Sequence, residues 1–309
     1  MITTVTLNPA IDKTVTVENF KASQVNRILS IQENLGGKGI NVTKVLTHLG
    51  GISTALGFIG QKNLNLIMNF MTQEKFTTNF IPVDALTRTN TKIIDPITKD
   101  TTDINEPGFS VNATHIEQMR DRITYFSEQS SFMVFSGSVC QGIDPETFTE
   151  LVKCVKANCK VVLDADGEIL LAGLKAAPFL IKPNIHELEK LIGHNLESDQ
   201  AIIQACQHLI QKYHVSYILV SMGEYGSLLV SSQETLKVNA LKVEVVSTVG
   251  AGDSMLAGFL YQYERTLDLK KALQYGACTG SLAVTGISTD ALRQHRIEDY
   301  LSKLDVHTI

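Results

Sequence analysis

Apolar residues recur along the chain with two spacings that alternate from segment to segment. Helical stripes, with apolar residues at i, i+3, i+4 and i+7, begin at Leu64, Ile116 and Phe148, and a further helix is expected from Ser198. Between them lie short apolar runs of strand length, at residues 53–59, 132–135, 161–163, 179–181 and 217–220. Such apolar runs are typical of parallel strands that helices cover on both faces. The alternation therefore predicts an α/β layered fold.

Two stretches interrupt this alternation. Residues 13–18 and 87–104 are rich in Thr, Val and Ile, alternate in polarity and contain no helical stripe. They predict a small antiparallel sheet beside the main one, which we interpret as a lid. The chain has neither a low-complexity linker nor an internal repeat. We therefore expect one domain over residues 1–309, with lid insertions at about 12–35 and 86–110.

Charge and composition narrow the function classes. The net charge of −5 disfavours a broad nucleic-acid surface. No tract reaches the ~18 apolar residues of a membrane span, and the first residues lack the basic flank of a signal peptide. The five cysteines form no Cys-x-x-Cys pair, which favours free thiols in a reducing compartment. We expect a cytoplasmic protein with neither nucleic acid nor membrane as partner, which must gather local cations if it binds an anion.

A glycine-containing segment at residues 247–254 precedes an apolar helical stripe. Gly250 and Gly252 let the backbone turn tightly, so that unpaired N–H groups point at one place. The helix dipole makes that place favourable for an anion. Asp253 would be repelled there unless it contacts a different partner, such as a hydroxyl about to attack phosphorus. The alternative is an aspartate that merely favours the first helical turn.

A second glycine-rich segment, residues 34–41, opens another helix. It is neither a Walker A loop, since no Ser or Thr follows Gly37-Lys38, nor the dinucleotide fingerprint. Glycines that allow close backbone approach, with Lys38 and Asn41 projecting, suit a polyhydroxylated ligand. The alternative is a glycine-rich turn that caps a helix.

In order and in sequence, these two segments resemble the two signatures of the phosphofructokinase B (ribokinase-like) carbohydrate kinases. Segments 7–12, 87–92, 103–108, 135–138, 181–187 and 220–226 follow in the family's order, so the resemblance covers roughly residues 1–285. It implies a ribokinase-like three-layer α/β/α sandwich with a mainly parallel central sheet and a small β-sheet lid. It also implies an ATP-dependent kinase that uses Mg²⁺.

The resemblance carries roles to individual positions. Asp253 would be the catalytic base, with Gly250, Ala251 and Gly252 as the anion hole. The nucleotide would contact Asn184, Ser221, Gly223 and Gly226, and Glu187 would hold Mg²⁺ through water. The sugar phosphate would contact Asp12, Gly37, Lys38, Asn41, Arg88, Lys92, Asn105 and Ser138.

Three of these residues are cations. Arg88 and Lys92 lie four apart on a lid strand and so share a face, and with Lys38 they would converge on the phosphate that the sugar already carries. The alternative is that Arg88 and Lys92 are edge-strand charges that discourage aggregation.

The substrate is expected to be a ketohexose phosphate. Asn105-Glu106 and Lys92 look more like the branch of the family that phosphorylates fructose 1-phosphate to the bisphosphate, and tagatose 6-phosphate is the alternative. An alternative of another class is a sugar-phosphate-binding regulator without catalysis. Pairing of two chains through the lid is a family expectation. Two segments depart from the family pattern, namely Gly-Ser-Val-Cys at 137–140 and Asp-Ala-Asp-Gly at 164–167.

Overall fold

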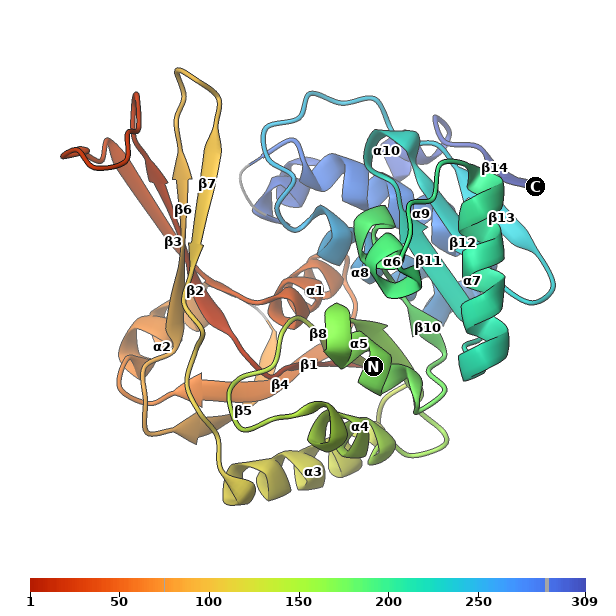
Figure 1. Cartoon of the computed structure of the whole chain (residues 1–309), viewed down its shortest axis with the longest axis horizontal. Helices are drawn as coiled ribbons and strands as arrows, with labels where there is room; N and C mark the ends of the chain where they lie inside the picture. Colours follow the sequence, from red (N-terminus) through yellow and green to blue (C-terminus); the bar gives the residue numbers. More distant parts are fainter. Residues whose placement is uncertain (75, 287–288) are drawn as a thin grey trace.

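Parallel strands form the centre of the molecule (Figure 1). The computed structural model describes residues 1–74, 76–286 and 289–309. In spatial order the central sheet contains β14 (Val306–Thr308), β13 (Thr235–Val238), β12 (Ser227–Val230), β11 (Tyr217–Ser221), β10 (Leu180–Ile181), β9 (Lys160–Asp164), β8 (Phe132–Ser136), β1 (Ile2–Thr6), β4 (Ser53–Gly60) and β5 (Thr77–Val83). The strands from β11 to β5 are parallel, and β12, β13 and β14 are antiparallel. The carboxyl ends of the parallel strands therefore meet at one edge.

Helices cover both faces of this sheet, as predicted. One layer contains α3 (Ala113–Ser127), α4 (Pro145–Lys153), α5 (Gly167–Leu174), α6 (Ile185–Ile192) and α7 (Asp199–Tyr213), and the other contains α1 (Lys38–His48), α8 (Ala251–Thr266) and α9 (Leu269–Ala283). Strand β8 serves both layers, because Met133 and Phe135 pack into the first core while Phe132 and Val134 pack into the second. The expected three-layer sandwich is confirmed. The short helix α10 (Glu298–Leu301) lies near the C-terminus.

A small four-stranded sheet rises beside the central one, at the upper left of Figure 1. It consists of β3 (Ser30–Gly36), β2 (Ala10–Thr16), β6 (Arg88–Ile94) and β7 (Thr101–Asn105), in that order. The expected antiparallel pairing is wrong for β2 and β6, which are parallel. Each of these strands continues from a strand of the central sheet, β2 from β1 and β6 from β5. Because β1 and β5 run in the same direction, their continuations do too.

Helix α2 (Leu64–Gln73) belongs to the junction of the two sheets. Its Ile67 packs in one cluster with Ile11 and Leu35 of the small sheet and Ile40 of α1. The base of the small sheet is thus anchored in a hydrophobic core of its own.

Side-chain caps fix where several helices begin. Asp144 accepts from the amide of Thr147 at the start of α4, and Ser198 accepts from the amide of Ala201 at the start of α7. All five cysteines are free, as expected. No helix within the described ranges combines the length and the apolar character that crossing a membrane requires.

Candidate active site

Asp253 lies in the first turn of α8, behind a glycine turn. Gly250 precedes the helix with φ 75°, a left-handed conformation that glycine adopts without strain. The Asp253 side chain is buried and accepts a hydrogen bond from Nδ2 of Asn41 at 2.9 Å. Asn41 stands in the first turn of α1. The two glycine-rich segments singled out in the sequence therefore meet at this carboxylate, although they lie more than 200 residues apart.

The surroundings of Asp253 raise its pKa. Burial contributes most, and the nearby Asp164 carboxylate adds to it, so that the pKa rises from 3.8 to about 6. The amide of Asn41 and the ammonium groups of Lys38 and Lys182 act in the opposite direction. A carboxylate with this pKa is ionised at neutral pH yet is a stronger base than an ordinary aspartate.

The predicted anion hole is only partly open. The amide of Ala251 donates to the carbonyl of Thr248 at 3.3 Å, so it is engaged in the turn that precedes α8. The amides of Gly252 and Asp253 have no backbone partner among the described residues. A Cβ at Gly252 would lie 3.1 Å from Nζ of Lys182, so the bare glycine leaves space between the helix end and an ammonium group.

A buried lysine–aspartate network faces Asp253. Oδ1 of Asp164, at the end of β9, lies 3.2 Å from Nζ of Lys182 and 3.6 Å from Nζ of Lys38. Its Oδ2 accepts from the hydroxyl of Ser136 at 3.0 Å. Burial raises the pKa of Asp164, but the two lysines and these hydrogen bonds outweigh burial and hold the pKa below its ordinary value. Asp164, foremost among several carboxylates, in turn raises the pKa of Lys38.

Sequence reasoning assigned no role to Lys182 or to Asp164. Lys182 directly follows an apolar strand and precedes Pro183-Asn184, and its side chain is only 5% exposed. A lysine at such a position was the available signal, because lysine is rarely buried without a partner.

The predicted nucleotide residues gather at the carboxyl ends of β10 and β11, which is where open α/β sheets bind ligands. Asn184 and Glu187 form a capping box at the start of α6, each side chain accepting from the other's amide at 2.9 Å. Ser221 pairs with Asn184 through an isolated β-bridge. Oε1 of Glu187 lies 3.7 Å from Nζ of Lys38. Glu187, and Asn184 through its capping box with Glu187, thus border the lysine–aspartate network.

Gly223 and Gly226 form the turn after β11, both with positive φ. A Cβ at Gly226 would lie 2.0 Å from the carbonyl oxygen of Val238, whereas one at Gly223 would meet nothing within 4 Å. Gly226 is therefore required by packing, and Gly223 stands beside open space.

The predicted sugar residues surround the junction of the small sheet with the core. Oδ1 of Asp12 accepts from Nδ2 of Asn90 at 3.2 Å. A Cβ at Gly36 would lie 1.8 Å from Oδ2 of Asp12, so the glycine turn packs directly against this carboxylate. Gly37 is equally constrained, with φ 115° and a would-be Cβ 2.9 Å from the methyl group of Thr6. Asn105 is exposed on β7.

Arg88 ties the small sheet to the core. Its guanidinium donates to the carbonyls of Glu106 at 2.9 Å and Asn8 at 3.2 Å, and to the hydroxyl of Ser138 at 3.5 Å. Burial lowers the pKa of Arg88, although Asp12 and Glu106 oppose this. Asn8, which sequence reasoning also left without a role, donates to Ser138 as well.

The structure does not bring the three predicted cations to one point. Lys38 pairs with Asp164 and Glu187, and Lys92 pairs with Asp103 at 2.7 Å across β6 and β7. Arg88 instead donates to the backbone carbonyls of Glu106 and Asn8 and to the hydroxyl of Ser138. The lid strand presents Arg88 and Lys92 on one face, as its period predicts, but each cation has its own partner.

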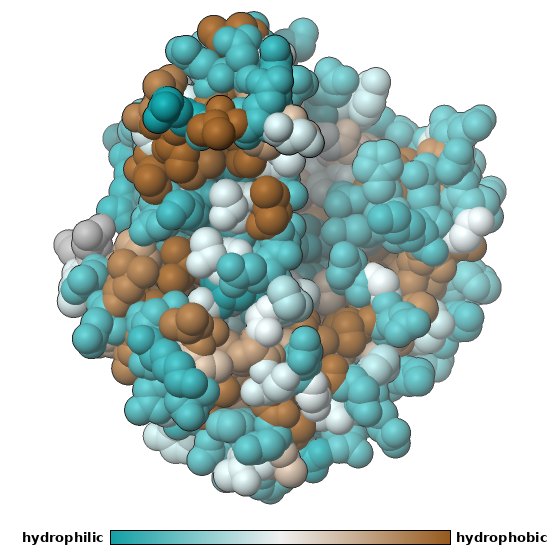
Figure 2. All heavy atoms as spheres, turned by 60° about the vertical axis from the view of Figure 1, so that its left-hand side comes forward, coloured by the Kyte–Doolittle hydropathy of each residue, from teal (hydrophilic) through white to brown (hydrophobic). Residues whose placement is uncertain are grey.

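A pocket lies between the small sheet and the start of α8. Its lining includes Asp12, Asn34, Asn41, Lys44 and Gly250. In Figure 2 the small sheet forms the upper lobe, and the surface between this lobe and the rest of the molecule is hollowed. The pocket thus joins predicted sugar residues to the turn that precedes Asp253.

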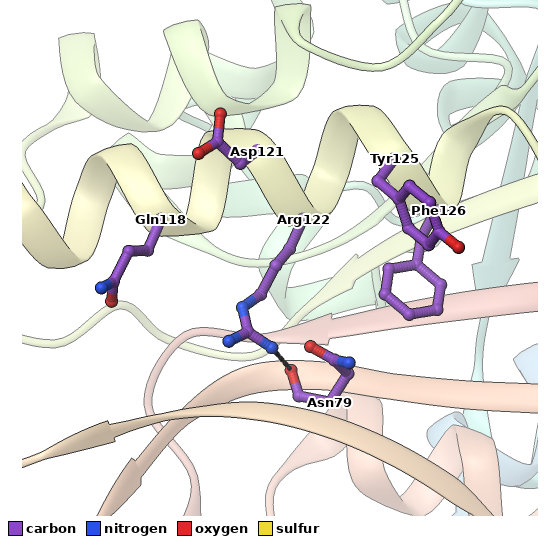
Figure 3. A pocket seen from close by; sticks show the side chains of 6 residues that line it. All are labelled: Asn79, Gln118, Asp121, Arg122, Tyr125 and Phe126. Atoms are coloured by element: carbon purple, nitrogen blue, oxygen red, sulfur yellow. Dashed lines mark hydrogen bonds between the residues drawn. The ribbon is translucent and has the colours of Figure 1, made fainter.

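A second surface hollow lies away from these residues, between α3 and β5 (Figure 3). Arg122 donates to the backbone carbonyl of Asn79 at 3.2 Å across it, and Tyr125 and Phe126 line one end. None of the predicted site residues lines this groove.

The sequence and fold match known proteins over nearly the whole chain. The model of the pfkB family carbohydrate kinases matches residues 5–295. The chain is 34% identical to 1-phosphofructokinase of Haemophilus influenzae, covering 100% of this chain and 98% of that protein, and 33% identical to 1-phosphofructokinase of Bacillus subtilis, covering 99% of both. Phosphofructokinase-2 from Escherichia coli in complex with potassium superposes with TM-score 0.89 at 27% identity, over 97% of this chain and 99% of that one. The chain therefore belongs to the pfkB family of carbohydrate kinases.

Proposed function

We propose that the chain transfers the γ-phosphoryl group of ATP to the free primary hydroxyl of D-fructose 1-phosphate and so produces fructose 1,6-bisphosphate. The observation that carries the proposal is Asp253: a buried carboxylate of raised pKa, at a helix N-terminus and beside two lysines. The family membership and the names of the relatives support a sugar-phosphate acceptor.

In the proposed reaction Asp253 orients the acceptor hydroxyl. A hydroxyl is too weak an acid to lose its proton to a carboxylate in advance, so the proton moves as the new bond forms. The hydroxyl oxygen bonds to the γ-phosphorus, the bond from phosphorus to the β–γ bridging oxygen breaks, and ADP leaves. Asp253 takes up the hydroxyl proton. The amides of Gly252 and Asp253 and the ammonium of Lys182 stabilise the charge on the phosphoryl oxygens.

The residues near Asp253 also suit a nucleotide with its magnesium ion. Asn184, Ser221, Gly223 and Gly226 would border the phosphates, and Glu187, whose Oε1 faces the site, would hold Mg²⁺ through water. Mg²⁺ neutralises phosphate charge when it is bound. Asp164 lies against both Lys182 and Lys38, whereas Glu187 pairs with Lys38 alone, at 3.7 Å, among the described residues. Glu187 is therefore the less compensated of the two carboxylates.

Asp12, Gly37, Lys38, Asn41, Arg88, Lys92, Asn105 and Ser138 remain our proposed sugar-phosphate residues. In the structure Asp12 and Asn41 line one pocket. Lys38 stands on the phosphoryl side, since it pairs with Asp164. The small sheet would act as a lid over the sugar.

Tagatose 6-phosphate remains the alternative acceptor, and a non-catalytic regulator the alternative of another class. The relatives named 1-phosphofructokinase favour the fructose substrate, and the intact Asp253 favours catalysis. The test is ADP release with ATP and Mg²⁺ against fructose 1-phosphate, fructose 6-phosphate, tagatose 6-phosphate and the free sugars. The highest kcat/KM is expected with fructose 1-phosphate. Sugar-phosphate binding without turnover would select the regulator.

The same assay tests the base. Asp253→Asn is expected to lower kcat by a factor of about 10²–10⁴ and to leave sugar-phosphate binding nearly unchanged. The control is Asp144→Asn, which removes the charge of an exposed carboxylate at the start of α4 and keeps an oxygen that can cap the helix. An Asp253→Asn variant with wild-type turnover would exclude this carboxylate as the base.

We further propose that the protein works as a homodimer in a soluble, cytoplasmic setting and that two chains pair through the small sheet. Figure 2 shows apolar side chains gathered on the upper lobe. Val25, Ile28, Leu29, Ile31 and Ile104 are each at least half exposed there. A second copy of this sheet would cover them.

A further inference from the structure

Four polar residues form one row across the small sheet. Asp12 of β2 pairs in register with Asn34 of β3 and with Asn90 of β6, and Asn90 pairs with Asn105 of β7. Residues directly opposite one another on neighbouring strands project from the same face. One face of the sheet therefore carries a carboxylate flanked by three amides. Asn34 and Asp12 also line the pocket that reaches Gly250.

The Asn90 side chain makes one hydrogen bond in this row, through its nitrogen, and none through its oxygen among the described residues. Its Nδ2 donates to Oδ1 of Asp12 at 3.2 Å, which fixes the orientation of the amide. Its Oδ1 is buried and has no partner among the described residues. A buried amide oxygen without a donor is costly, and native proteins rarely leave one unpaired. The position therefore calls for a donor that the described side chains do not supply.

The neighbouring positions indicate what that donor belongs to. Burial raises the pKa of Asp12, whereas the hydrogen bond from Asn90 and the charges of Lys44, Arg88 and Lys92 act in the opposite direction. In its ionised form Asp12 can only accept hydrogen bonds. Two acceptors side by side, the Asp12 carboxylate and the Asn90 oxygen, match two neighbouring hydroxyl groups. Arg88 stands two residues before Asn90 on the same face, near Ser138 and the core. Asn90 is thus the next residue after Arg88 on this face of β6, and it lies further from the core.

We propose that Asn90 is a specificity-determining residue whose amide oxygen accepts a hydrogen bond from a ring hydroxyl of the ketose, next to the hydroxyl that Asp12 holds. The inference rests on the proposed function, because it assigns part of that site's sugar recognition. Asn90 takes no part in phosphoryl transfer. Its contribution is to select the arrangement of hydroxyls on the ring carbons that do not react.

If Asn90 only orients Asp12 and does not contact the sugar, a different result is expected. Loss of a residue that only orients Asp12 lowers kcat/KM for every substrate by the same factor. Loss of a direct contact lowers kcat/KM only for substrates that carry the partner hydroxyl. The test therefore pairs Asn90→Ala and the size-conserving Asn90→Leu with fructose 1-phosphate and its 3-deoxy and 4-deoxy analogues. Thr91→Ala is the matched control, because Thr91 is the next residue on β6 and projects from the opposite face.

We expect Asn90→Ala to lower kcat/KM for fructose 1-phosphate about tenfold, the effect of one hydrogen bond at the upper end of its usual range. For the deoxy analogue that lacks the partner hydroxyl, the same substitution is expected to change kcat/KM less than about twofold. Thr91→Ala should leave all three values near wild type. Thermal melting checks that both Asn90 variants are folded, and either one suffices for the comparison.

Equal losses on all three substrates, or no loss on any, would overturn the assignment of Asn90 alone. Failure of the wild-type protein to phosphorylate any ketose phosphate would instead overturn the proposed function. In that event calorimetric titration with the same three sugars completes the comparison through binding affinities. The two failures are therefore distinguishable.

Discussion

The ionised carboxylate of Asp253 is expected to lower the free energy of unfolding of the protein. Its pKa in the folded protein is about 6, against an ordinary value of 3.8. A carboxylate whose pKa is raised by folding binds its proton more tightly in the folded state. Its ionisation therefore destabilises the fold, with no effect below about pH 3.8 and the full effect above about pH 6. At 1.36 kcal/mol per pH unit, the difference of 6 − 3.8 corresponds to about 3 kcal/mol.

The substitution Asp253→Asn removes this ionisation and keeps the shape of the side chain. The oxygen of an asparagine can still accept from Asn41 Nδ2. We therefore expect Asp253→Asn to raise the free energy of unfolding by up to about 3 kcal/mol at pH 8, while it lowers kcat by a factor of about 10²–10⁴. The gain should shrink as the pH falls from 6 towards 4, since the wild-type carboxylate then becomes neutral as well.

Urea denaturation of both proteins between pH 4 and pH 8 measures this difference. Asp144→Asn is a control of opposite sign: the backbone amide of Thr147 holds the pKa of Asp144 below its ordinary value, so that substitution should lower stability at neutral pH. The reasoning is refuted if Asp253→Asn is no more stable than wild type at pH 8. A gain that stays constant down to pH 4 would also contradict it, since the cause would then not be the charge.

Two further predictions concern the lysine–aspartate network and the small sheet. Lys182→Met should lower the free energy of unfolding by about 3 kcal/mol, because it leaves Asp164 with the longer ion pair to Lys38. The double variant with Asp164→Asn should recover much of that loss. If urea denaturation shows that the losses of the two substitutions simply add, the proposed coupling between the two residues is contradicted. Ile31→Glu, at an exposed residue of β3, should convert a dimer into a monomer in light scattering, whereas Ile52→Glu, at an exposed residue just before β4, should not. A monomeric wild-type protein would rule out the proposed pairing.

Hydrophobic periodicity was sufficient to predict the layers of this fold. The runs at 53–59 and 132–135 became β4 and β8, and the stripes from Ile116 and Phe148 became α3 and α4. Periodicity failed where pairing depends on distant segments. The parallel pairing of β2 and β6 follows from the direction in which both leave the central sheet, and no local pattern records that direction.

The candidate site, too, was predicted where local motifs identify residues and missed where contacts depend on distant segments. Motifs located Asp253 and Asn41, because a glycine turn before a helix is a local signal, and the structure joins the two side chains. Lys182 and Asp164 were missed, since a lysine is recognisable as a buried ion-pair partner only when its carboxylate is known to lie beside it. The expected convergence of Lys38 with Arg88 failed for a related reason. Alternation places charges on one face, but the partner of each charge comes from another strand.

The buried charges at the edge of the central sheet are best understood together. Lys38, Lys182 and the N-terminus of α8 are positive, and Asp164, Asp253 and Glu187 are negative, all within one partly buried region. Lys182 has Asp164 as its partner, whereas Asp253, among the described residues, has the amide of Asn41 as its one direct side-chain partner. A carboxylate that the fold leaves without a cation is kept at a cost in stability. That cost is consistent with a group whose proper partner is a hydroxyl proton, which arrives only with the substrate.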